Sequence, residues 1–145
     1  MIQKSKSRRR KQKSKKNMNL TKIKYRFPPH QELFNLLLSR SELNINAMRN
    51  TGCTALMISA MYGYTTICEM LLLRGANVHM KSRDGFTALA YACIGENSSI
   101  NIVKLLIDAR SNIYWRNRYG KNLVSVSFNR NVKNYLKMLG IEDGQ

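Results

Sequence analysis

Apolar side chains recur along this chain with the spacing of a helix, and the pattern itself returns every 33 to 35 residues. One position of the pattern holds Leu38, Leu71 and Leu106. The position four residues earlier is also apolar in every copy, with Phe34, Ile67 and Ile102. Residues that are four apart lie on one face of a helix. The pattern therefore predicts three similar helices, each with one apolar face.

A short phrase of five residues forms a second repeated signal. Residues 52–56 read Gly-Cys-Thr-Ala-Leu, residues 85–89 read Gly-Phe-Thr-Ala-Leu, and a weaker copy, Gly-Lys-Asn-Leu-Val, follows at 120–124. A Thr side chain can cap the first N–H groups of a helix, so we expect helices to begin near Thr54 and Thr87. A fixed period of this length is typical of a stack of helical units rather than of one closed core.

Each unit is predicted to contain a helix, a tight turn, a second helix rich in Leu and Ile, and a long loop. Gly75 is expected to end the second helix in a left-handed conformation, which a side chain disfavours. Arg110 stands at the equivalent position of the next unit, where that conformation costs on the order of 1 kcal/mol relative to Gly. Two extra residues around 96–99 separate the two helices of this unit.

Together these features resemble the ankyrin repeat, with Gly-x-Thr-x-Leu, a helix of small residues, a Leu-Leu pair and then Gly-Ala-Asn-Val at 75–78. The resemblance covers about residues 31–139 and is weakest at both ends. It departs from the family at Ala55 and Ala88, where Pro is preferred. The resemblance implies an all-α ankyrin-repeat solenoid of helix-turn-helix units joined by β-turn loops.

The repeats divide the chain into a tail and a short capped array. Phe27-Pro28-Pro29 marks the start of the array, and the last copy has lost its Thr and most small residues, as terminal repeats often do. The predicted segments are a basic disordered tail at 1–26, a degenerate repeat or cap at 27–46, repeats at 47–79 and 80–114, and a capping repeat with a tail at 115–145.

Basic residues dominate the charge, with 25 Lys and Arg against 8 Asp and Glu and a net charge of +17. Residues 1–24 hold eleven of the basic residues and no acidic residue, so the rest carries 14 − 8 = +6. The tail has no apolar period, and we expect it to be disordered alone. Its densest basic stretch consists of Lys4, Lys6, Arg8, Arg9, Arg10, Lys11, Lys13, Lys15 and Lys16.

Three interpretations of the tail stay open. It could be a nuclear localisation signal around Arg8-Arg9-Arg10-Lys11. It could be an arm that contacts the phosphates of nucleic acid or anionic lipid through counterion release. It could also be a solubilising charge run without a partner.

Residue types that carry catalysis are sparse. The chain has two His and three Cys, and no Cys-x-x-Cys pair, Gly-rich phosphate loop or nucleophile–base set is apparent. We therefore expect free thiols, no cofactor, no metal and no enzymatic activity. No secretory signal or membrane-spanning run is recognised, so we expect a place in the nucleus or cytoplasm, of a host cell if the source is a virus or an intracellular bacterium.

In ankyrin-like proteins the partner contacts the loop tips and the concave face of the first helices, which implies that the chain binds another protein. The predicted contact residues are Met48, Asn50, Thr51, Cys53, Met61 and Tyr62 in the first full unit, Lys81, Arg83, Asp84, Phe86 and Ile94 in the second, and Arg116, Arg118, Tyr119, Lys121 and Arg130 in the third. The nominated residues grow more basic toward the C-terminus, and together with Trp115 they suggest a partner with an acidic or aromatic-rich surface. We expect the chain to be a monomer. For Tyr62, Phe86 and Ile94, packing between repeats is the alternative. The Trp115 indole could anchor a partner or lie buried under the cap.

Overall fold

The fold is taken from a computed structural model, which describes residues 43–143 of the chain. Residues Asn44–Gln145 form one compact unit. The basic tail, the boundary at Phe27-Pro28-Pro29 and the helix expected around Phe34 and Leu38 lie outside the described residues. Those predictions therefore remain predictions.

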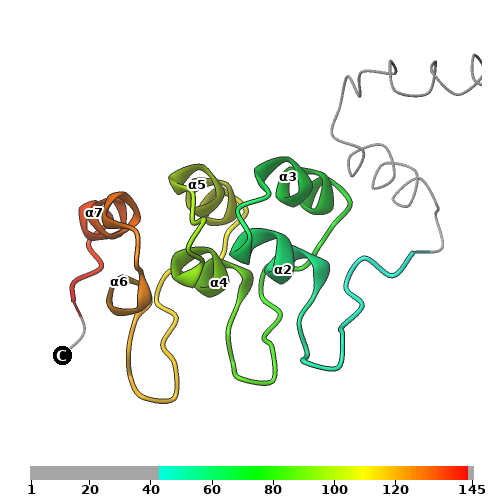
Figure 1. The fold of residues 1–145 in the computed structure, drawn as a ribbon, viewed down its shortest axis with the longest axis horizontal. Coiled ribbons are helices and arrows are strands. Elements are labelled where there is room, and N and C mark those ends of the chain that lie inside the picture. The colour runs from blue at the N-terminus through cyan, green and yellow to red at the C-terminus, as the bar shows by residue number, and fades with distance from the viewer. Residues whose placement is uncertain (1–42, 144–145) are drawn as a thin grey trace, which may run out of the picture. The chain divides into compact units, whose positions relative to one another are not determined.

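Three helix pairs follow one another along the described chain. They are α2 (Ala55–Met61) with α3 (Thr65–Leu73), α4 (Ala88–Ile94) with α5 (Ile100–Asp108), and α6 (Leu123–Val126) with α7 (Arg130–Met138). The inner row is α2, α4 and α6, the outer row is α3, α5 and α7, and long loops project from the inner row (Figure 1). Each helix packs against its pair partner and against its neighbours in the same row. The described residues therefore form the predicted all-α solenoid.

The inner helices begin where the sequence predicted. The Oγ1 atoms of Thr54 and Thr87 each accept a hydrogen bond at 3.3 Å from the backbone N–H three residues later. Asn122 replaces Thr in the third unit, and its Oδ1 accepts the same bond from the Ser125 N–H at 3.0 Å. Because Asn is as good a helix cap as Thr, the third unit keeps its start signal despite the lost Thr.

The outer helices also share one way of ending. Gly75, Arg110 and Gly140 follow them with φ of 80°, 68° and 81°. In each unit the next N–H donates to a carbonyl one turn back in the helix. These bonds join Ala76 N to Leu71 O, Ser111 N to Leu106 O, and Ile141 N to Leu136 O. This pattern is the Schellman motif, and Arg110 is the one described residue other than Gly with a positive φ. The left-handed conformation expected at Gly75 is confirmed.

The core lies between the two rows. Leu71 and Leu106, predicted to be buried, are 1% and 0% exposed, and Leu136 occupies the same place in the third unit. The inner helices contribute Leu56, Leu89 and Leu123, which are buried as well. Helix α6 has only four residues, whereas α2 and α4 have seven each. The third unit therefore lacks nearly one turn of its inner helix.

The two-residue insertion sits in the connection 95–99 between α4 and α5, whereas 62–64 suffices between α2 and α3. The insertion packs closely against the first unit, as shown by Gly95, where an added Cβ atom would overlap the Met61 carbonyl oxygen. It also contacts the third unit, where Asn129 Nδ2 donates to the Ser98 carbonyl at 2.9 Å. The inserted residues therefore connect the units on both sides.

Candidate functional site

The three loops share one backbone geometry at their tips. In each, a Gly N–H donates to the carbonyl three residues earlier, at 2.8 to 3.0 Å. The turns are Arg49–Gly52, Ser82–Gly85 and Asn117–Gly120, and their Gly residues have φ of 75°, 81° and 75°. At Gly52 space is short as well, since a Cβ atom would lie 2.8 Å from the Arg83 backbone nitrogen. The loops are therefore ordered hairpins with two central residues at each tip.

The side chains at these tips face solvent. The central pairs are Asn50 and Thr51, Arg83 and Asp84, and Arg118 and Tyr119, all of them exposed. Four more predicted residues lie beside them and are exposed too. The ten residues, which we call the loop edge, are Met48, Asn50, Thr51, Lys81, Arg83, Asp84, Arg116, Arg118, Tyr119 and Lys121. The structure thus brings together most of the residues that the sequence nominated.

The remaining nominated residues lie elsewhere. Met61 and Ile94 are the last residues of α2 and α4, and Tyr62 follows α2 directly, with its ring stacked on Tyr64 at 6.1 Å. These three occupy the opposite end of the inner helices from the loops. Arg130 begins α7 in the outer row.

Phe86, Tyr91 and Trp115 form an aromatic cluster next to the loop edge. The Phe86 ring lies 5.5 Å from the Tyr91 ring and 5.1 Å from the Trp115 ring, centroid to centroid. Trp115 is only 3% exposed, and its Nε1 donates to the Gly85 carbonyl at 2.9 Å. Of the two interpretations of Trp115, burial is therefore correct and the anchoring of a partner is wrong. Its role is to fix the third loop against the second.

The cysteine thiols face inward. Cys53 donates to the Tyr91 hydroxyl at 3.4 Å, and Cys68 lies 3.2 Å from the Ser59 hydroxyl. Burial raises the pKa of Cys68, and it raises the pKa of Cys93 to about 12. All three cysteines are free. Within residues 43–143 no group of three His, Cys, Asp or Glu side chains could hold a metal ion.

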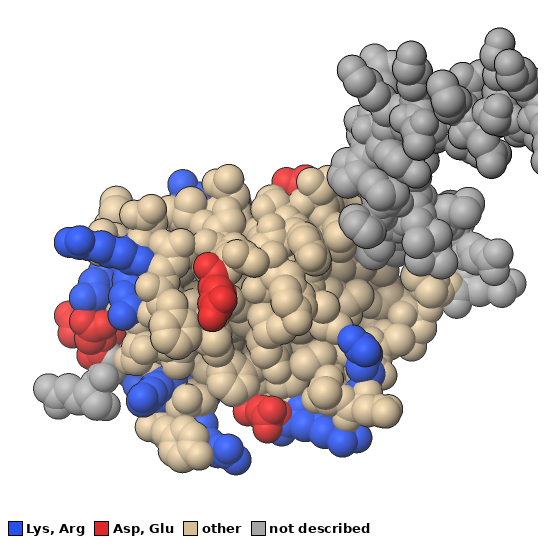
Figure 2. All heavy atoms as spheres, viewed as in Figure 1, with Lys and Arg blue, Asp and Glu red and all other residues tan. Residues whose placement is uncertain are grey.

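Basic residues accumulate toward the C-terminal end of the array. Residues 109–141 contain seven Lys and Arg and no Asp or Glu. On the face shown in Figure 2, Lys and Arg gather along the loops and at the α7 end. The third unit therefore presents a positive field to any approaching partner.

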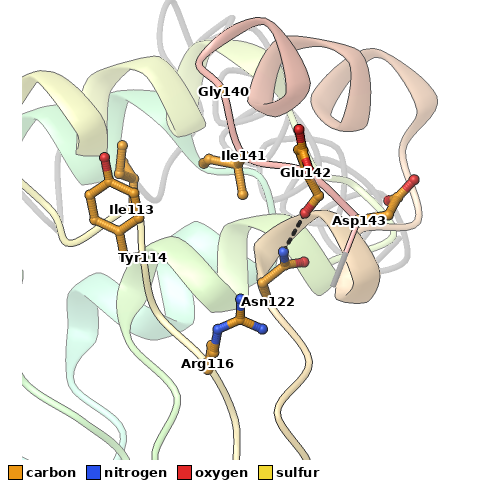
Figure 3. A pocket seen from close by; sticks show the side chains of 8 residues that line it. All are labelled: Ile113, Tyr114, Arg116, Asn122, Gly140, Ile141, Glu142 and Asp143. Carbon is orange, nitrogen blue, oxygen red and sulfur yellow. Dashed lines mark hydrogen bonds between the residues drawn. The ribbon is translucent and has the colours of Figure 1, made fainter. Parts of the chain in front are cut away.

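A hollow at the C-terminal edge joins the third loop to the chain that follows α7 (Figure 3). Asn122, the cap of α6, also donates through Nδ2 to the Glu142 carbonyl across this hollow. Ile141 is buried beside it, and Lys137 pairs with Asp143 at 2.6 Å. The polar contacts here hold the last residues in place, which makes the hollow a structural junction.

Stacked helix pairs with hairpin loops define a helical solenoid repeat protein, a class that presents extended concave surfaces to binding partners. The sequence model of the family of ankyrin repeats (3 copies) matches residues 25–117, which is more than half of the chain. The chain belongs to the ankyrin-repeat family, whose repeats are in general protein–protein interaction modules. The pair α6–α7 lies beyond the matched residues, although it has the arrangement of the other two.

Several curated proteins are similar to this chain. Protein fem-1 homolog A-like of Mus musculus is 32% identical over 103 residues, which are 69% of this chain and 15% of that protein. The Notch-regulated ankyrin repeat-containing protein of Homo sapiens is 35% identical over 72 residues, 48% of this chain and 63% of that protein. The chain thus spans less than two thirds of either relative. In the described part of the chain, no helix is long and apolar enough to cross a membrane.

The sequence did not reveal several exposed apolar side chains, among them Leu73, Tyr114, Met138 and Phe128, the last of which directly follows the short α6. The spacing of the buried leucines in the sequence does indicate that α6 is short. Leu71 and Leu106 are 35 residues apart, whereas Leu106 and Leu136 are 30 apart. The shorter spacing marks the lost turn of α6.

Proposed function

We propose that this chain is a non-catalytic, monomeric ankyrin-repeat protein that binds another protein through its loop edge and the exposed face of its inner helices. One observation carries the proposal. The backbone at the three tips is fixed by repeated hydrogen bonds, while the side chains at the tips stay exposed. A binding surface on an ordered backbone loses less conformational entropy when the partner docks.

The charge of the loop edge favours a partner with an acidic surface. Five of its ten residues are Lys or Arg, and Asp84 is the one carboxylate among them. Complementary charge speeds association and rejects partners of like charge. We therefore expect binding to weaken as the salt concentration rises.

Affinity purification with mass spectrometry tests the proposal directly. The full chain is compared with the double variant Arg83→Ala/Arg118→Ala, which changes two tip residues. The matched control is Lys104→Ala/Lys137→Ala, which removes the same charge from the outer row. We expect the tip variant to lose partners that the control retains. Equal recovery by both variants would contradict the assignment of the loop edge.

A second candidate function rests on the tail, with its eleven basic residues and no acidic residue in 1–24. We propose as the alternative that the tail binds a polyanion, either nucleic acid or an anionic membrane. The logarithm of the affinity for duplex DNA should then fall by about 0.9 per phosphate contact for each tenfold rise in salt. Deletion of 1–24 should abolish this binding, and a deletion that leaves it intact would exclude the tail as the arm.

The tail also motivates a proposal about location. Arg8-Arg9-Arg10-Lys11 matches the pattern of a nuclear localisation signal. We propose that it directs the protein to the nucleus, with the cytoplasm as the alternative. A fluorescent fusion should lose nuclear enrichment when these four residues are changed to Ala, and an unchanged distribution would refute the signal.

A further inference from the structure

The missing turn of α6 leaves an open hollow in the third unit. After Val126 the chain turns away from the inner row, whereas α4 continues to Ile94. The hollow encloses about 670 Å³ between the end of α4, the third loop and the start of α7. Its lining includes Phe86, Ile94, Val126 and Phe128. We call this hollow the third-unit groove. Its volume lies in the range of pockets that hold ligands.

Phe128 gives the groove a fixed apolar wall. Its side chain is 75% exposed, but its backbone N–H donates to the Cys93 carbonyl at 3.4 Å. The next residue, Asn129, caps α7 and also donates to the Ser98 carbonyl. An exposed aromatic ring on an anchored backbone can bind with little loss of conformational freedom. Such rings are common among the residues that dominate binding energy.

The rim of the groove is cationic. Lys121 from the third loop and Lys133 from α7 both line it. No Asp or Glu is among the residues that line the groove, so the lining itself offers no carboxylate to neutralise the two lysines. An apolar floor between two cations fits a ligand that has an apolar group between two anionic groups, because the apolar surfaces then pack together and the charges are opposite.

We propose that the third-unit groove binds an acidic peptide segment of a partner protein, with one large apolar side chain on the floor and carboxylates against Lys121 and Lys133. The inference rests on the proposed protein-binding function and gives it a second surface, which shares Tyr119 and Lys121 with the loop edge. Tyr119 and Phe128 also line the groove, but its floor holds aliphatic Ile94 and Val126, and the Phe86 ring already packs against Tyr91 and Trp115. A peptide is therefore favoured over nucleic acid, whose bases stack on free aromatic faces.

The experiment selects peptides from a random-peptide phage library on the full chain and then measures the affinity of the enriched peptides. We expect the enriched sequences to carry Asp or Glu on both sides of one large apolar residue. Phe128→Ala should weaken their affinity by about tenfold or more, since buried aromatic anchors dominate such contacts. Lys121→Glu/Lys133→Glu should weaken it at least as much, whereas the control Lys104→Glu/Lys137→Glu, with the same change of charge, should leave it within about twofold.

Folding does not obscure the result, because Phe128 and Lys121 are exposed and a thermal melt of each variant checks stability. Enriched peptides without the acidic and apolar pattern, or equal binding to groove and control variants, would overturn the groove. The groove would also fail as a peptide site if a single-stranded oligonucleotide displaced the peptides and lost its binding in the groove variants. If only Arg83→Ala/Arg118→Ala loses the peptides, the groove fails and the proposed function stands. If cellular partners survive the loop-edge and the groove variants alike, both proposals fail.

Discussion

Two substitutions, Gly75→Arg at the end of α3 and Arg110→Gly at the end of α5, test most directly how the outer helices end. Gly75 and Arg110 hold the same position in successive units, with φ of 80° and 68°. Arg110→Gly removes a side chain from a residue whose backbone is left-handed, which removes the strain. Gly75→Arg adds a side chain to such a residue and so creates the strain. The two changes should therefore shift the free energy of unfolding in opposite directions.

The magnitude follows from two opposing terms. A side chain in the left-handed region costs about 1–2 kcal/mol, whereas Gly loses about 0.5–1 kcal/mol more backbone entropy on folding. Steric contact adds nothing at Gly75, where a Cβ atom would meet no atom within 4 Å. We expect Arg110→Gly to raise the free energy of unfolding by about 0.5–1 kcal/mol and Gly75→Arg to lower it by a similar amount.

Urea denaturation followed by circular dichroism measures both changes. A thermal melt gives an independent check, since 1 kcal/mol moves the midpoint of a domain of this size by about 4–8 °C. Arg110→Ala is the control, because it removes the guanidinium but keeps the Cβ atom that causes the strain. If Arg110→Gly and Arg110→Ala have the same effect, or if Gly75→Arg is neutral, the strain argument is wrong.

Three further changes test the core, the insertion and a buried thiol. Leu106→Ala should lower the free energy of unfolding by about 2–5 kcal/mol in urea, and a loss far under 1 kcal/mol would contradict its place in the core. Gly95→Ala should cost about 1–3 kcal/mol in the same assay, because its Cβ atom would fall on a carbonyl oxygen, whereas Glu96→Ala beside it should be nearly neutral. The pKa of Cys93 is about 12 when folded against 9.0 when unfolded, so only the unfolded thiol loses its proton in this range. Its contribution to stability is complete below pH 9 and should then fall by about 1.4 kcal/mol per pH unit up to about pH 12. Cys93→Ala should reduce the observed slope by this amount, while Cys68 and Tyr91, whose pKa values are also raised, keep their own parts.

Much of the fold could be predicted because its signals are local. Thr54 and Thr87 cap helices through bonds that span only three residues, and Gly75 ends a helix through its own φ. The positions of Leu71 and Leu106 followed from the repeat period, which aligns equivalent side chains without knowledge of the packing. These features needed no information about which segments meet in space.

The rest of the structure depends on contacts between distant segments. Trp115 is buried because its indole reaches the Gly85 carbonyl, a contact across 30 residues. Its surroundings could not be inferred from its neighbours in the chain. The loop edge could be nominated from the family resemblance, and its exposure agrees with that nomination, but which of its residues bind a partner stays a prediction. The third-unit groove was not predicted, because it depends on where α6 ends and on how residues of two repeats lie around that end.

The third unit combines features that weaken the stack with features suited to binding. Its inner helix is short, and α7 has Lys133 and Lys137 where α5 has Val103 and Ile107, so it buries less apolar surface. The exposed ion pair of Lys137 with Asp143 contributes only about 0–1 kcal/mol in return. A unit that only closed the stack would gain nothing from an exposed Phe128 or from six Lys and Arg against two carboxylates. A binding role accounts for both, because the lost turn opens the groove and the cations select what enters it.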